Sequence, residues 1–287
     1  MAIYCFVSGY AHYMQSTETE LRHRWKRLLR FLIPFWVIAA VFSVIGIFTG
    51  NPAIPASAKE FLLNCLTIKN SYNGAWWYAN TYILLVALQP LSRKFVERCP
   101  AWAVLLAFFA FYTVGYGIRF WGWGSCCSAV LAWIITHIGL LGTSYFPYVI
   151  GMLFCKKQVV AALRQRLAAV KARNIYIYIF TAITFAGMIV VHGVIQPLFV
   201  AFITATVTII LLCICPLPVW LTNLLCYFGE HSTNIWLVHM FFYGSLFHGI
   251  VFFLKYPIPV FLFLIALSLA SSYVIKWLSR PILKLVR

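Results

Sequence analysis

Apolar stretches about twenty residues long and free of charge recur along almost the whole chain, and they constrain its fold more than any other feature. Hydrophobic residues make up 63% of the 287 residues and charged residues only 9%, whereas a soluble domain carries roughly 25% charged residues. A chain of this composition could not cover its own surface with polar groups in water. The sequence therefore predicts a protein that crosses a membrane many times.

The apolar stretches also predict the number of crossings. A helix needs about 20 apolar residues to cross a hydrocarbon core of ~30 Å. Counting stretches of this size, we expect an all-α fold: a transmembrane helical bundle of about eight full spans in a single domain over residues 1–287. The predicted spans are residues 31–49, 75–92, 101–118, 138–155, 174–191, 195–215, 232–254 and 258–278.

The basic residues predict the orientation of these spans. The chain has 22 Lys and Arg residues against 5 acidic residues, a formal net charge of +17. Basic clusters alternate with sparsely charged loops, as the positive-inside rule requires, and this topology accounts for most of the charge. No basic stretch outside the spans is interleaved with stacking aromatics, so nucleic acid is not an expected partner. The predicted cytoplasmic segments are 15–30, 93–100, 156–173, 216–231 and 280–287, and the predicted external ones are 50–74, 119–137, 192–194 and 255–257.

The acidic residues and the cysteines exclude several chemistries. The chain contains no aspartate, which rules out paired aspartates and Asp-rich magnesium sites. The nine cysteines include no Cys-x-x-Cys pair, so we expect no metal site and interpret the cysteines as small apolar fillers. A disulfide between Cys65 and either Cys126 or Cys127 is compatible with the predicted topology, and the spacing leaves it open.

The N-terminal residues 1–14 are apolar but shorter than a span. As a helix they would cover only about 21 Å, which predicts a partial helix that runs from the outside to the inside. No positive residues precede this apolar run, so it does not have the pattern of a signal peptide. We therefore expect that a further segment precedes it in the complete protein.

Two other segments are predicted to lie at the membrane surface. Trp76, Trp77 and Tyr78 lie where an aromatic belt would meet the external interface. Residues 156–173 predict a helix on the inner leaflet, with a role in substrate binding as the alternative. The apolar face of that helix consists of Val159, Leu163, Leu167 and Val170.

The densest group of polar residues near a span lies at residues 228–243. Polar groups inside a membrane are costly, which makes them candidates for function. They have two interpretations: a polar seam that hydrogen-bonds neighbouring helices, or a site that binds substrate. Helical spacing puts Ser232, Trp236, His239 and Tyr243 on one stripe, with Glu230, His231 and Asn234 on the neighbouring face.

Five segments, in order along the chain, resemble the motifs of the acyltransferase type 3 family. This resemblance implies an integral membrane acyltransferase that moves an acyl group, an acetyl group in our interpretation, from acyl-CoA to a hydroxyl of a surface glycan or another envelope carbohydrate. Acyl-CoA is then the donor substrate, and no cofactor is expected. The segments are FVSGYAHY (6–13), RHRWKRLLRFLIPFW (22–36), NGAWWYANTYILLVALQPL (73–91), YFPYVIGMLFCKK (145–157) and GEHSTNIWLVHMFFY (229–243).

The chain departs from the family pattern at its start. The family's first membrane helix carries a basic residue and the histidine held to be catalytic, and it precedes the segment that FVSGYAHY resembles. His12 lies in the next helix and does not match that motif, so no catalytic residue is assigned in this chain. The resemblance therefore implies that the chain as given lacks acyl transfer and that a preceding helix would restore it.

The resemblance also implies where the substrates bind. Acyl-CoA is polyanionic, and guanidinium groups such as those of Arg27 and Arg30 hold phosphate bidentately; the alternative is that these residues only orient the protein. A histidine suits proton transfer from an acceptor hydroxyl near neutral pH, and His239 is either a residue lining this site or a packed core histidine. The remaining residues predicted to bind substrate are Trp76, Trp77, Ser232, Asn234 and Trp236.

Two other classes of protein fit the same composition. A transporter for a small or lipid-linked substrate would use the polar residues to line its path, although the sequence has no clear internal repeat. An inactive family member that only inserts into the bilayer is the second alternative. For the acyltransferase, we expect a multi-pass protein of the cell membrane, in particular the bacterial inner membrane, with the lipid bilayer, acyl-CoA and a carbohydrate as partners.

Overall fold

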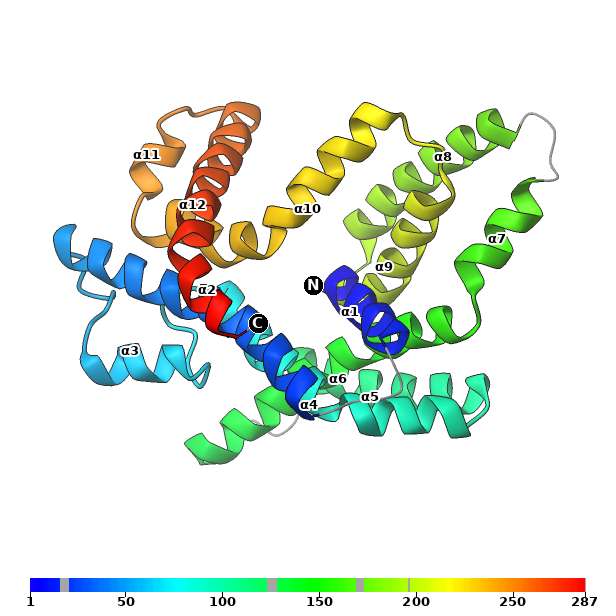
Figure 1. Ribbon diagram of the computed structural model, residues 1–287, viewed down its shortest axis with the longest axis horizontal. Coiled ribbons are helices and arrows are strands. Elements are labelled where there is room, and N and C mark those ends of the chain that lie inside the picture. The colour runs from blue at the N-terminus through cyan, green and yellow to red at the C-terminus, as the bar shows by residue number, and fades with distance from the viewer. Residues whose placement is uncertain (16–20, 123–127, 169–172, 196, 287) are drawn as a thin grey trace. The chain divides into compact units, whose positions relative to one another are not determined.

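A computed structural model describes residues 1–15, 21–122, 128–168, 173–195 and 197–286 of the protein (Figure 1). Within these ranges the chain is helical and has no β-strand, which confirms the predicted all-α fold. The helices form two compact units: the first comprises Met1–Thr19 and Leu84–Pro218, and the second comprises Glu20–Ile83 and Val219–Arg287. A single domain over the whole chain stays a prediction.

Each unit combines helices from separate parts of the sequence. The first unit contains α1 (Ala2–Met14), most of α4 (Trp77–Arg98), α5 (Ala101–Trp121), α6 (Ala129–Lys156), α7 (Val159–Ala168), α8 (Arg173–Val194) and α9 (Pro197–Ile214). The second contains α2 (Leu21–Phe48), α3 (Ala58–Cys65), the 3₁₀-helix η1 (Gly74–Trp76), the first turns of α4, α10 (Val219–Met240), the π-helix η2 (Phe241–Ser245), α11 (His248–Phe252) and α12 (Pro257–Leu285).

Five of the described helices are long and apolar enough to cross a membrane. They overlap five of the predicted spans, and a shorter apolar helix, Leu198–Ile214, lies within a sixth. The total of eight full spans stays a prediction. The five helices are His23–Phe48, Ala101–Trp121, Ala129–Lys156, Asn174–Val194 and Pro257–Leu285.

Some helices continue beyond the predicted spans into the basic clusters. α2 already begins at Leu21, and α4 continues to Arg98. Lys and Arg are good helix formers, and their long side chains can carry the charge away from an apolar environment. A charge-free window therefore locates the apolar part of a helix and misses its basic ends.

The predictions of a loop over residues 216–231 and of one uninterrupted span over 232–254 are both wrong. α10 begins at Val219 and ends at Met240, and it is followed by η2 and, after a break, by α11. The charge of Glu230 limited the apolar window, yet this residue is exposed and α10 continues through it. An exposed charged residue can lie within a helix, so the charge of Glu230 does not mark a loop.

In the first unit, α1 and α6 pack with almost no space between their backbones. The predicted partial helix over residues 1–14 is confirmed as α1. A Cβ atom added to Gly9 would lie 1.8 Å from the carbonyl oxygen of Tyr148, and one added to Gly151 would lie 2.0 Å from that of Phe6. Small residues permit this close approach, which is a usual way for helices to associate in membranes.

The C-terminal end of α1 is held by side chains of its neighbours. The buried His12 places Nδ1 2.9 Å from the hydroxyl of Tyr148 on α6. Arg93 on α4 donates to the carbonyl oxygen of Tyr13 at 3.4 Å, and its guanidinium group lies 4.9 Å from the centre of the Tyr13 ring. A cation at this position is also favoured by the helix dipole. Arg93, predicted only as part of an orienting cluster, therefore fastens α1.

We expect Gly9→Ala to destabilise the first unit by about 1–3 kcal/mol, because the new methyl group collides with the backbone of α6. The matched control is Gly187→Ala on α8, where no described atom lies within 4 Å of the added Cβ atom. Alanine favours a helix by up to about 1 kcal/mol over glycine, so the control should be neutral or stabilising. Thermal unfolding of both variants in detergent measures this, and equal shifts of Tm would contradict the packing argument.

In the second unit, the segment between α2 and η1 is organised around Asn64 and Glu60. The buried Asn64 donates to the carbonyl oxygen of Glu60 at 2.9 Å and to Ser71 Oγ at 2.8 Å, and it accepts from the backbone N–H of Tyr72 at 3.2 Å. The hydrogen bond from Lys69 to the Glu60 carboxylate, 2.6 Å long, lowers the pKa of Glu60 below its usual value. These contacts fix the segment that leads into η1.

Two predictions lie partly or wholly outside the described ranges. The disulfide between Cys65 and Cys126 or Cys127 is one of them, because the latter two residues are not described. The predicted surface segment 156–173 does contain a helix, α7. Arg164 of α7 donates to the carbonyl oxygen of Cys213 on α9 at 2.8 Å, so this basic side chain joins α7 to α9. The inner-leaflet position of α7 stays a prediction.

Candidate functional site

All residues predicted to bind substrate belong to the second unit, so the structure gives their relative positions. α2 carries the two arginines, α10 carries the polar residues, and the two tryptophans lie where η1 meets α4. The set consists of Arg27, Arg30, Trp76, Trp77, Ser232, Asn234, Trp236 and His239.

On the α10 stripe, His239 has a ring nitrogen available for chemistry. Its Nδ1 lies 2.7 Å from the carbonyl oxygen of Trp236. Because a carbonyl oxygen only accepts, Nδ1 must be the donor, and in the neutral ring Nε2 keeps the lone pair. The side chain is half-buried, with its ring centroid 5.7 Å from that of Tyr243. The geometry suits hydrogen bonding of Nε2 to a hydroxyl group.

Trp236, at the middle of the stripe, has an unused polar group. The side chain is buried, and its Nε1 has no hydrogen-bond partner within the part of the chain that the structure describes. A buried donor without a partner costs about 1–3 kcal/mol. Ser232, one turn earlier, donates to the carbonyl oxygen of Gly229 at 2.8 Å. Trp236 is therefore the stripe residue whose N–H most needs an acceptor.

The neighbouring face of α10 bonds to α12. His231 Nδ1 lies 2.9 Å from Ser272 Oγ, and Asn234 donates to the same oxygen at 3.1 Å. Lys276 Nζ lies 3.3 Å from His231 Nε2; because an ammonium group only donates, Nε2 accepts and Nδ1 carries the proton. This face of α10 therefore forms a polar seam with α12, and Asn234 belongs to the seam.

Trp76 lies in the core of the second unit, so the belt prediction for this residue is wrong. It is 2% exposed, and its ring centroid lies 4.6 Å from that of Phe35 and 5.6 Å from that of Phe241. Trp76 Nε1 donates to the carbonyl oxygen of Leu237 at 3.0 Å, and Asn73 Nδ2 donates to the same oxygen at 2.8 Å. This carbonyl lies just before α10 passes into η2, and π-helical segments are frequent at functional sites. Asn73 and Trp76 are far from Leu237 in the sequence, so local sequence patterns do not predict these hydrogen bonds.

A row of aromatic rings leads from the α10 stripe toward α2. Tyr78 is buried, which also contradicts its predicted place in a belt. Its ring centroid lies 5.7 Å from that of Trp236, 5.8 Å from that of the half-buried Trp77 and 6.4 Å from that of Tyr82. Tyr82 in turn interacts electrostatically with Arg27 of α2. The row of rings therefore extends from Trp236 on α10 to Tyr82, which lies near the basic start of α2.

The basic residues of this segment differ in exposure. Arg30 is exposed and Arg27 is half-buried. The Nε atom of Arg24 is buried and has no hydrogen-bond partner among the described residues. Three guanidinium groups within two helical turns suit a ligand with several negative charges. Within the described ranges, no group of three or more His, Cys, Asp or Glu side chains could hold a metal ion.

Sequence reasoning missed three residues of this arrangement. Asn73 could have been recognised, because asparagine is a preferred residue before a helix, and its Oδ1 accepts from the backbone N–H of Ala75. Tyr78 and Tyr82 are four residues apart and so share one face of a helix. Their position between α2 and α10 depends on the tertiary structure.

The comparison with known families identifies the class of protein. A profile of the acyltransferase 3 family, described as an acyltransferase domain, matches residues 1–277. The chain therefore belongs to the acyltransferase 3 family, which implies a membrane acyltransferase and agrees with the apolar helices. No curated protein matches the chain, and no solved structure does.

Proposed function

We propose that this protein is a multi-pass O-acyltransferase of the cell membrane, specifically the bacterial inner membrane. In this proposal it moves an acetyl group from acetyl-CoA to a hydroxyl of a surface glycan or another envelope carbohydrate. Membership of the acyltransferase 3 family supports membrane acyl transfer. The donor, the acceptor and the type of membrane are parts of the proposal.

The observation that carries the proposal is the row of aromatic rings within the second unit. At one end, Arg27 and Arg30 on α2 offer cationic groups to the phosphates of CoA, which guanidinium groups bind bidentately. At the other end, the buried Trp236 N–H has no partner among the described residues, and the bond of His239 Nδ1 to the Trp236 carbonyl oxygen leaves Nε2 as the acceptor nitrogen of the neutral ring. The two ends match the two halves of the donor, a polyanionic nucleotide and a thioester.

The reaction itself exchanges one bond for another. The acceptor oxygen attacks the thioester carbonyl carbon, so that a C–O bond forms and the C–S bond breaks. The proton lost by the acceptor hydroxyl ends on the CoA sulfur, and CoA departs as the free thiol. We assign the Trp236 N–H to the carbonyl oxygen, on which negative charge develops. We assign His239 Nε2 to a hydrogen bond with the acceptor hydroxyl, which makes His239 a residue that lines the site.

The proposal is tested by following a labelled acetyl group. Membranes that contain the chain with the family's first membrane helix placed before residue 1 are supplied with acetyl-CoA labelled in the acetyl group and with envelope carbohydrate. We expect labelled carbohydrate and free CoA in equal amounts. Accumulation of intact labelled substrate inside sealed vesicles, without label on carbohydrate, would indicate a transporter and contradict the proposal.

His239→Asn tests the assignment of that side chain. Asparagine can still donate to the Trp236 carbonyl oxygen, but it has no counterpart of Nε2. If Nε2 bonds the acceptor, His239→Asn and His239→Ala should both lower acetyl transfer by roughly 2- to 10-fold, the equivalent of one hydrogen bond. Transfer rates at several acceptor concentrations measure this. If His239 only packs, His239→Asn should keep the full rate, and the assignment would be wrong.

A further inference from the structure

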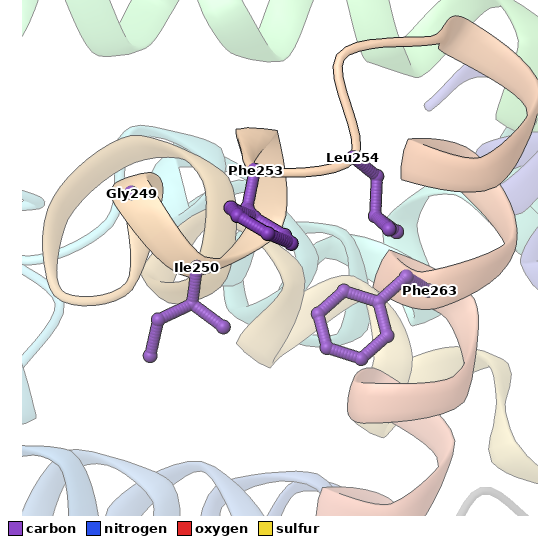
Figure 2. Close-up of a pocket in the computed structure, with 5 residues that line it drawn as sticks. All are labelled: Gly249, Ile250, Phe253, Leu254 and Phe263. Atoms are coloured by element: carbon purple, nitrogen blue, oxygen red, sulfur yellow. The ribbon is translucent and has the colours of Figure 1, made fainter.

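An apolar cavity of about 400 Å³ lies between α11 and α12 in the second unit. Gly249 and Ile250 contribute from α11, Phe253 and Leu254 from the residues that follow it, and Phe263 from α12. Figure 2 shows the side chains of these residues gathered around one space. All of them are apolar or lack a side chain, and the volume is in the range of small-ligand pockets. Because the lining is apolar, it favours a hydrocarbon group as the ligand.

The cavity lies close to one end of a helix that is long enough to cross a membrane. α12 begins at Pro257, and Phe263 lies about 9 Å further along its axis at 1.5 Å per residue. Phe253 and Tyr256 are 79% and 72% exposed, as expected for aromatic residues at a membrane interface. In the predicted topology the cavity therefore lies at the depth where the acyl chains of a lipid meet its head group.

A single basic residue directly follows Leu254 in the sequence, the last lining residue before α12. This residue, Lys255, is exposed and is the sole Lys or Arg between residues 231 and 275 of the sequence. No acidic residue follows Glu230 in the chain, so Lys255 has no carboxylate near it in sequence. Its φ of 59° is a left-handed conformation that glycine adopts more readily. A lysine at a position that favours glycine suggests a use for its ammonium group.

We propose that this cavity binds one acyl chain of an anionic phospholipid whose phosphate contacts Lys255. The apolar lining takes the chain, and the cation gives the site a preference for a negatively charged head group. The inference depends on the cavity and on Lys255 and is independent of the acyl-transfer proposal. A lipid held here would also fill the space between α11 and α12.

The experiment uses the full chain in nanodiscs of phosphatidylcholine. A small fraction of the lipid is either phosphatidylglycerol or phosphatidylcholine with a photoreactive diazirine in the same acyl chain. After irradiation, peptide mass spectrometry locates the crosslinks. We expect the phosphatidylglycerol probe to label residues 249–263 about fivefold more than the phosphatidylcholine probe, the effect of one cation near a membrane surface.

Two variants separate the chain site from the head-group contact. Lys255→Gln, on an exposed position, should equalise labelling by the two probes. Gly249→Leu puts a side chain where no described atom lies within 4 Å of the new Cβ atom and should reduce labelling of 249–263 severalfold with both probes. Gly229→Leu, on the exposed surface of α10, is equally unhindered and is the matched control. Equal labelling by both probes in the unaltered protein would overturn the proposal, as would undiminished labelling of Gly249→Leu.

Discussion

Replacing Trp76 by alanine is expected to lower the free energy of unfolding of the second unit by about 3–5 kcal/mol, the usual cost of removing a buried tryptophan. The ring contacts α2 through Phe35 and η2 through Phe241, so its loss leaves a cavity between elements that are far apart in the sequence. Unfolding followed by Tm and by denaturant in detergent measures the effect. Trp277→Ala on α12 removes an exposed tryptophan and is the matched control, which should be nearly neutral.

The hydrogen bonds to the Leu237 carbonyl oxygen predict a specific pattern of non-additivity. Trp76→Phe keeps much of the ring and loses the indole donor, while Asn73 still bonds the carbonyl. Asn73→Ala leaves the indole donor in place. The double variant removes both side-chain donors, so it should cost more than the sum of the two single changes, by about 0.5–3 kcal/mol. If the cost of the double variant equals the sum of the two single costs, the two donors do not replace each other at the Leu237 carbonyl oxygen.

The composition of the chain was sufficient to predict its all-α fold, and the reason is physical. A chain with so little charge must bury its apolar surface in lipid, where only helices and closed barrels satisfy the backbone. The ends of the helices could not be predicted in the same way. Arg98 and Glu230 both lie within helices, because exposed charged side chains do not interrupt backbone hydrogen bonding, whereas the window used for prediction stopped at every charge.

The arrangement of the candidate residues could be predicted only in part from the sequence. Helical spacing correctly separated the stripe of Trp236 and His239 from the face that carries His231 and Asn234. It could not show that Ser272 of α12 receives two hydrogen bonds from that second face. Nor could it place Trp76, whose aromatic character suits an interface and a core equally well. The position of such a side chain depends on contacts between segments that are far apart in the sequence.

The second large effect is expected at the basic start of α2. Arg27→Ala and Arg30→Ala should each weaken CoA binding by on the order of 1.5–3 kcal/mol, because each removes charge-assisted hydrogen bonds to phosphate. This corresponds to a rise in Kd of roughly 10- to 150-fold per substitution. Equilibrium binding of labelled CoA to the protein in nanodiscs measures the effect, at fixed ionic strength because salt screens exposed charges.

The control for this prediction must remove a positive charge without removing the site. Lys59→Ala does so, since Lys59 is exposed on α3, a helix that follows the opposite end of α2. Its affinity for CoA should match that of the unaltered protein. Arg27→Lys and Arg30→Lys add a second distinction, because lysine keeps the charge but cannot bond phosphate bidentately. If charge alone mattered, both lysine variants would bind normally; if the planar guanidinium matters, they should fall between arginine and alanine. Unchanged affinity in both alanine variants would mean that these arginines only orient α2 in the membrane.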